Sequence, residues 1–251
     1  NISFSWLFHL LTTVSIVICV FSFPALAFIT VIMVNLYLVV FTSFWPVTVL
    51  MLLWLAFDWK TPERGGRRFN CVRRWCLWKH YSNYFPLKIV KTKDIPTNHN
   101  YILACHPHGL LSHSWFGHFS TDTTGFSKIF PGITPYMLTL GAFFWVPFLR
   151  EYIMSTGACS VSQSSIDFLL TQKGTGNMLV VVVGGLAECK YSMPGSTTLF
   201  LKKRQGFVRT ALRYGIQHSG MGDLSVYSNW LTLVFSGSTD RSNAEATLIQ
   251  V

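Results

Sequence analysis

The chain has 251 residues, of which half are hydrophobic and only 12% are charged, and its formal net charge is +10 at pH 7. Soluble globular domains average about 25% charged residues, so this composition argues against an ordinary soluble protein. The basic excess does not indicate nucleic-acid binding, because so apolar a chain offers no soluble basic domain and no recognition motif. The composition favours a protein that works at a membrane.

The first 57 residues contain no Asp, Glu, Lys or Arg. This stretch exceeds the roughly 20 residues with which a helix crosses a bilayer, and it lacks the basic start of a cleaved signal peptide. Pro24, Asn35 and Pro46 interrupt it. We therefore expect a transmembrane helical hairpin over residues 1–57, with helices over 10–33 and 36–57 and a turn near Asn35.

A basic segment follows over residues 58–94 and is expected to lie on the membrane surface. Basic loops face the cytosol, and indoles concentrate at the membrane interface. The six cysteines are scattered and resemble reduced thiols, which also indicates the cytosol. The part of the chain that follows the hairpin is therefore expected to face the cytosol. The basic residues and tryptophans concerned are Lys60, Arg64, Arg67, Arg68, Arg73, Arg74, Lys79, Lys88, Lys91, Lys93, Trp54, Trp59, Trp75 and Trp78.

Two histidines follow a short apolar run. Residues 101–105 predict a buried strand, and the sequence His106-Pro107-His108-Gly109 predicts a tight turn after it. Ligands of open α/β sheets bind at the carboxyl ends of the strands. A histidine there can accept the proton of an attacking alcohol, because the imidazole pKa ordinarily lies close to neutrality.

Residues 178–183 predict a second strand, apolar on both faces and therefore parallel and covered by helices. Gly184-Gly185 would turn the chain and leave Glu188 near the same edge as the histidines. Helices are predicted over residues 162–173 and 207–214, the first as a crossover with Ser164 and Asp167 in capping-box spacing. The predicted fold class is therefore α/β.

Other interpretations of these residues stay open. A histidine beside a core strand is often a hydrogen-bonded structural residue. Metal binding by His106, His108, His113 and His118 is disfavoured, because Pro107 breaks the strand alternation and no Cys-x-x-Cys or His-Glu-x-x-His motif accompanies them. We expect no metal. Cys105 could be an acyl-accepting nucleophile, although its strand position favours a buried structural thiol.

The chain resembles the diacylglycerol acyltransferase type 2 family, and within it the acyl-CoA wax-alcohol acyltransferases. The resemblance rests on motifs in the family's order over residues 35–215: Tyr84-Phe85-Pro86, His106-Pro107-His108-Gly109, Phe130-Pro131-Gly132-Ile133-Thr134-Pro135-Tyr136, Leu149-Arg150-Glu151-Tyr152, Gly184-Gly185-Leu186-Ala187-Glu188 and Arg204-Gln205-Gly206-Phe207.

The resemblance implies a membrane-associated acyltransferase core that transfers a fatty acyl group from acyl-CoA to a lipid alcohol. The products would be wax esters, retinyl esters or acylglycerols. Acyl-CoA is then a co-substrate and no further cofactor is expected. Self-association stays open. His106 or His108 would be the general base, Glu188 would orient one imidazole, and backbone N–H groups near Gly109 would hold the oxyanion.

Substrate-binding positions are expected in two further motifs, Tyr84-Phe85-Pro86 and the basic segment with Lys202, Lys203, Arg204, Gly206, Phe207 and Arg209. Lysine and arginine near a helix N-terminus suit the phosphates of CoA. A solvated basic face that touches anionic lipid is the alternative. One departure is local: related glycerolipid acyltransferases carry Asn-His and an Asp five residues on, whereas Cys105 and Leu111 stand here.

The acyltransferase core is expected over residues 95–215, followed by a divergent tail over 216–251. The tail would lack a family strand and leave an unpaired sheet edge. The alternative function is therefore an inactive, truncated, membrane-anchored variant that associates with full-length acyltransferases.

Overall fold

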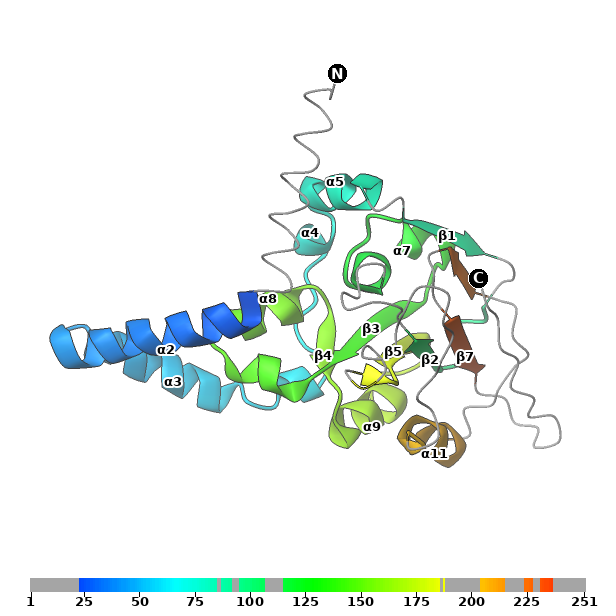
Figure 1. The fold of residues 1–251 in the computed structure, drawn as a ribbon. Coiled ribbons are helices and arrows are strands. Elements are labelled where there is room, and N and C mark those ends of the chain that lie inside the picture. Colours follow the sequence, from blue (N-terminus) through cyan, green and yellow to red (C-terminus); the bar gives the residue numbers. More distant parts are fainter. Residues whose placement is uncertain are drawn as a thin grey trace, which may run out of the picture.

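The computed structural model describes residues 23–84, 87–91, 95–106, 115–185, 187, 204–214, 224–227 and 231–236. For residues 23–28, 88, 90, 106, 224–227 and 231–236 it describes the backbone alone. A helical hairpin projects from an α/β body (Figure 1). The shorter helical elements of the body are η2 (Thr61–Glu63), α4 (Asn70–Arg73), α5 (Cys76–Tyr84), η3 (Phe116–Ser120), α7 (Phe126–Ile129), η4 (Gly141–Trp145) and α8 (Leu149–Ser155).

The hairpin consists of α2 (Phe23–Phe41) and α3 (Trp45–Phe57), which pack against each other. The predicted turn near Asn35 is wrong. Asn35 lies inside α2, where its side-chain amide donates to the Val31 carbonyl at 2.7 Å, so the polar group is satisfied without interrupting the helix. The turn comes at residues 42–44. Within the described part of the chain, no helix is long and apolar enough to cross a membrane.

Five strands form the main sheet in the order β4-β3-β5-β2-β7. The strands are β2 (Tyr101–His106), β3 (Thr134–Thr139), β4 (Ala158–Ser160), β5 (Asn177–Val182) and β7 (Leu231–Ser236). The prediction that residues 178–183 form a buried strand of a parallel sheet is confirmed, because β5 pairs in parallel with β2, with Cys105 opposite Val182. A separate antiparallel pair joins β1 (Lys88–Lys91) to β6 (Leu224–Tyr227).

The tail was expected to leave a sheet edge unpaired, but β2 is paired on both sides. Antiparallel β7 pairs with β2 from Tyr101 opposite Ser236 to His106 opposite Leu231. Residues 231–236 belong to the tail that we expected to leave an edge open. The backbone groups of β2 are therefore bonded on both sides.

The sheet is covered on both faces, as the apolar strands predicted. On one face, Leu169 of α9 (Gln163–Thr171) and Ala211 of α11 (Gly206–Arg213) pack against Ile102 and Leu179. On the other face, η3 and α7 supply further aromatic side chains to the core around Leu103, namely Phe119 and Phe126. The crossover helix was predicted, but its cap is Ser162, whose hydroxyl accepts from the Ser165 amide, and not Ser164.

Two side chains expected at the membrane surface are buried instead. The Arg73 guanidinium donates to the carbonyls of residues 119, 120, 121 and 156, and burial lowers its pKa to about 9, so it stays charged at pH 7. Trp78 is buried and donates to the Val72 carbonyl at 2.6 Å. Sequence composition could not show these contacts, because the accepting carbonyls come largely from distant segments.

A polar clasp, formed by Asn100 and Asn177, fixes the start of the central strands. The Asn100 side-chain oxygen accepts from the Asn177 backbone amide at 3.0 Å and from its side-chain amide at 3.1 Å. The Asn177 side chain also donates to the Leu169 and Gly174 carbonyls. Asn100 precedes β2 and Asn177 begins β5, so the clasp holds these two strands in register.

Replacement of Asn177 by Ala should destabilise the protein by about 1–3 kcal/mol, because the Leu169 carbonyl loses the Asn177 donor and the Asn100 oxygen and the Gly174 carbonyl each lose one of two donors. Thermal unfolding of the purified protein in detergent would measure the loss. Asn70→Ala is the matched control: Asn70 is exposed, so a change within about 0.5 kcal/mol is expected. Equal losses in the two variants would contradict the clasp.

Candidate active site at the carboxyl ends of β2 and β5

The carboxyl ends of the neighbouring parallel strands β2 and β5 lie side by side. The last bond between them runs from the Val183 amide to the Cys105 carbonyl at 3.2 Å. The next residue of the first strand is His106, and the residues after Val183 are Gly184 and Gly185. Gly185 has a φ of +56°, in the left-handed region that favours glycine, so the chain turns where the second motif begins.

The amino end of α11 packs beside these strand ends. Phe207 contacts a small cluster formed by Ala104 and Val183, the residues next to the two strand ends. The helix begins at Gly206, and in the described part of the chain no side chain caps its first turn. Free N–H groups at a helix start attract anions. Arg204 and Arg209 are exposed beside them.

The remaining predicted site residues are only partly described. Of His106 the structure gives the backbone, as the last residue of β2. Tyr84 is the last residue of α5 and is exposed. The predicted residues outside the described part of the chain are Phe85, Pro86, His108, Gly109, Glu188, Lys202 and Lys203.

The Cys105 side chain does not suit the role of a nucleophile. It is buried in the core with Leu103, Phe119 and Val180, and burial raises the pKa of its thiol far above the ordinary value. A thiol needs to ionise before it attacks a thioester. Cys105 is therefore a packing residue of β2.

His118 is the one histidine of the predicted cluster whose side chain is described. It is fully buried in η3, its Nδ1 lies 3.2 Å from the Thr124 hydroxyl, and its Nε2 has no partner. Burial lowers its pKa to about 4, so the ring is neutral at pH 7. Among the residues that the structure describes, no three His, Cys, Asp or Glu side chains come together as a metal site requires.

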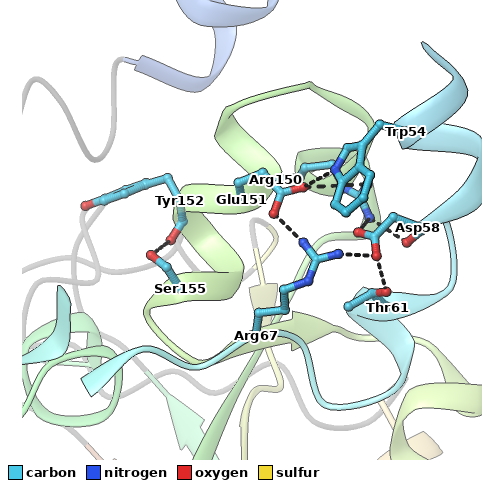
Figure 2. Close-up of polar contacts among 8 residues, drawn as sticks. All are labelled: Trp54, Asp58, Thr61, Arg67, Arg150, Glu151, Tyr152 and Ser155. Atoms are coloured by element: carbon cyan, nitrogen blue, oxygen red, sulfur yellow. Dashed lines mark hydrogen bonds and ion pairs between the residues drawn. The ribbon is translucent and has the colours of Figure 1, made fainter. Parts of the chain in front are cut away.

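A second polar site, which the sequence did not predict, joins the end of α3 to α8 (Figure 2). Arg150 is almost fully buried; its Nη2 donates to the Asp58 carbonyl at 2.8 Å and lies 3.0 Å from the Asp58 carboxylate. Arg67 bridges Asp58 and Glu151, at 2.6 Å from the second carboxylate. Glu151 also accepts from the Trp54 indole at 3.3 Å. Two acids and two arginines thus balance each other at the base of the hairpin.

The sequence did contain a signal for this network. Asp58 is the first charged residue after the uncharged residues 1–57, and Arg150 is the first after the uncharged residues 129–149. Asp58 and Arg150 carry opposite charges, and each ends a long uncharged run. Such a pattern is consistent with an ion pair that joins the two segments.

The fold and the strand-end motifs define an α/β protein whose ligands are expected at the carboxyl edge of its sheet. The sequence model of the family described as Diacylglycerol acyltransferase matches residues 37–236. The chain therefore belongs to the diacylglycerol acyltransferase family. The match runs past Gly215, where we expected the family pattern to end, and includes β6 and β7.

Several curated relatives are similar to the chain. The Acyl-CoA wax alcohol acyltransferase 2 of Mus musculus is 85% identical over 187 residues, which cover 74% of this chain and 56% of that protein. The Homo sapiens protein of the same name is 76% identical over 196 residues, which cover 78% of this chain and 59% of that protein. Diacylglycerol O-acyltransferase 2 of Mus musculus is 50% identical over 174 residues, covering 69% and 45%. The chain thus spans less than two thirds of each relative's length. No solved structure matches it.

Replacement of Asp58 by Ala should destabilise the protein by about 3–5 kcal/mol, because Arg150 would keep a buried charge without its main counter-ion. Glu151→Ala is the control: its side chain is 38% exposed, so its loss should cost about 1 kcal/mol or less. Unfolding temperatures in detergent would measure both changes. The double variant Asp58→Leu with Arg150→Met should recover much of the loss; no recovery would contradict the assignment.

Proposed function

We propose that this chain carries an acyl-CoA-dependent O-acyltransferase site at the carboxyl ends of β2 and β5. The observation that carries the proposal is the parallel register of Cys105 with Val182. Because of that register, the segment that begins at His106 and the segment that begins at Gly184 leave the sheet next to each other. Membership of the diacylglycerol acyltransferase family supports the reaction class.

The proposed reaction is a direct transfer. His106 or His108 accepts the hydroxyl proton while the alcohol oxygen attacks the thioester carbonyl carbon, and backbone N–H groups near Gly109 stabilise the oxyanion. The carbon–sulfur bond then breaks, the ester is released, and the CoA sulfur takes the proton from the imidazolium. Glu188 orients the basic imidazole. Burial of the Cys105 thiol supports direct transfer over an acyl-cysteine intermediate.

The proposed acceptor is a long-chain fatty alcohol, which gives a wax ester. This preference follows the names of two relatives, at 85% and 76% identity, each of which is called an acyl-CoA wax alcohol acyltransferase. Retinol, monoacylglycerol and diacylglycerol are the other acceptors in the proposal, and the diacylglycerol acyltransferase relative supports the last of these.

The proposed CoA site lies at the amino end of α11. The contact of Phe207 with Ala104 and Val183 brings the start of this helix to the strand ends. The dipole of the helix start and the exposed Arg204 and Arg209 suit a phosphate. Lys202 and Lys203 complete the proposed basic group.

We further propose that the hairpin inserts into the endoplasmic reticulum membrane, with the catalytic part in the cytosol. Large apolar side chains are exposed on both helices, among them Val40 and Phe41 on α2 and Leu50 and Leu53 on α3. Exposed apolar surface of this extent marks an interaction with lipid or protein. Trp59, Lys60 and Arg64 are exposed just beyond α3, where indoles and cations suit a headgroup layer.

Replacement of His106 or His108 by Ala should lower the rate of ester formation by about 10²–10⁴ for the residue that is the base. The full chain would be expressed in membranes without endogenous acyltransferases and given labelled acyl-CoA with each of the four acceptors. His99→Ala is the control, because His99 precedes β2 and lies at the opposite end of the strand.

Two results would count against this proposal. Near-full activity in both histidine variants would eliminate the general-base assignment. A wild-type chain that forms no labelled ester with any acceptor would favour an inactive, membrane-anchored variant that associates with full-length acyltransferases.

Charge-neutral replacements, Arg204→Gln and Arg209→Gln together, should raise the KM for acyl-CoA about tenfold or more, since each charged hydrogen bond contributes about 1.5–3 kcal/mol. Arg213→Gln is the control, because Arg213 is exposed in the last turn of the same helix. An unchanged KM with weaker recovery in the membrane fraction would show that these arginines contact anionic lipid instead.

A further inference from the structure

The segment from residue 140 to residue 148, which we call the aromatic loop, exposes large apolar side chains although it is firmly packed. Leu140, Trp145 and Phe148 are 53%, 59% and 73% exposed. Phe144 and Val146 between them are buried, and η4 packs against α8. The exposed side chains therefore stand on a fixed base.

Phe148 is held in a strained conformation that keeps its ring outside. Its φ is +64°, and it is the one non-glycine residue with a positive φ among the described residues. The Leu149 amide donates to the Pro147 carbonyl at 2.8 Å across it, which makes a γ-turn of the rare, strained hand. Such a bulky residue at positive φ costs about 1–3 kcal/mol. A strained residue that is also exposed suggests a functional role for Phe148.

The aromatic loop lies near the base of the hairpin, next to α8 (Figure 1). It ends two residues before Arg150, whose pair with Asp58 ties the start of α8 to the end of α3. The network of Figure 2 joins the same two elements through Arg67, Glu151 and Trp54.

The chemistry of the surroundings favours lipid as the occupant of this surface. Residues 129–149 contain no Asp, Glu, Lys or Arg, so the loop itself offers no charge that would orient a partner protein. Tryptophan is typical of the membrane interface. The exposed cations Lys60 and Arg64 follow α3 closely and would meet anionic headgroups at the level where the hairpin leaves the bilayer.

We propose that the aromatic loop is a second membrane-inserting element, which penetrates the lipid interface through Leu140, Trp145 and Phe148 beside the hairpin. The inference rests on the proposed membrane insertion of the hairpin. The Asp58–Arg150 pair fixes the relative position of the two elements, so the membrane contacts the body on both sides of this pair. The carboxyl ends of β2 and β5 would then be held at a fixed distance from the membrane, which supplies the lipid alcohol.

Site-specific photocrosslinking tests the proposal in the full chain. The photoreactive amino acid p-benzoylphenylalanine would replace Phe148, and in separate variants Trp145, Val40 and Leu212. Each variant would be reconstituted in phosphatidylcholine vesicles that contain phosphatidylserine and lipid with labelled acyl chains. Leu212 is the matched control, because it is 74% exposed on α11, close to the exposure of Phe148. Protease digestion patterns would confirm that each variant keeps the wild-type fold.

The expected result is a labelled lipid adduct at positions 148 and 145 that is comparable to that at position 40 and severalfold above that at position 212. Lipid labelling at 40, with labelling at 148 and 145 no higher than at 212, would overturn the aromatic-loop proposal and leave the hairpin proposal standing. Adducts from 148 to a second copy, or to another segment of the same chain, in place of lipid would overturn it as well. Labelling at none of the three positions would overturn the membrane insertion itself.

Discussion

The clasp between Asn100 and Asn177 is the constraint on which the rest of the structure depends. Four hydrogen bonds converge on the Asn177 side chain and backbone amide where β5 begins, and they fix its register against β2. Both strands are apolar and buried on both faces, so hydrophobic burial alone would tolerate a shift along the strand. With the register fixed at one end, the residues after Cys105 and Val182 leave the sheet as neighbours at the other end.

Two kinds of surface meet through a balanced ionic network. The hairpin and the aromatic loop are apolar and exposed, whereas the sheet is packed between helices. The ion pair of Asp58 and Arg150 joins the hairpin to the body, at the point where each of the two apolar segments ends. A buried pair of this kind contributes little net stability but makes the loss of one partner costly, and so specifies one arrangement of hairpin and body. Under the proposed function, that arrangement would set how the carboxyl ends of the strands approach the membrane.

The sequence predicted the elements that depend on local apolar runs. Strands β2 and β5, the parallel character of β5, and helices α9 and α11 all followed from apolar runs, glycine and capping signals. The sequence-based prediction failed where a polar side chain forms a local hydrogen bond. Asn35 donates to a carbonyl within its own helix and makes no turn, and Ser162 caps α9 in place of Ser164. It also failed for Arg73 and Trp78, because their burial depends on carbonyls brought together only by folding. The β7 pairing of the tail could not be predicted, since a strand register has no local sequence signature.

The central claim is that acyl-CoA reacts at the carboxyl ends of β2 and β5. An acyl-CoA analogue with a photoreactive diazirine next to the thioester would test this claim most directly, with labelled peptides identified by mass spectrometry. Labels are expected within residues 106–114 and 184–190, and an excess of ordinary acyl-CoA should remove them. Labels confined to the opposite edge of the sheet, such as residues 95–100 and 172–177, would contradict the claim.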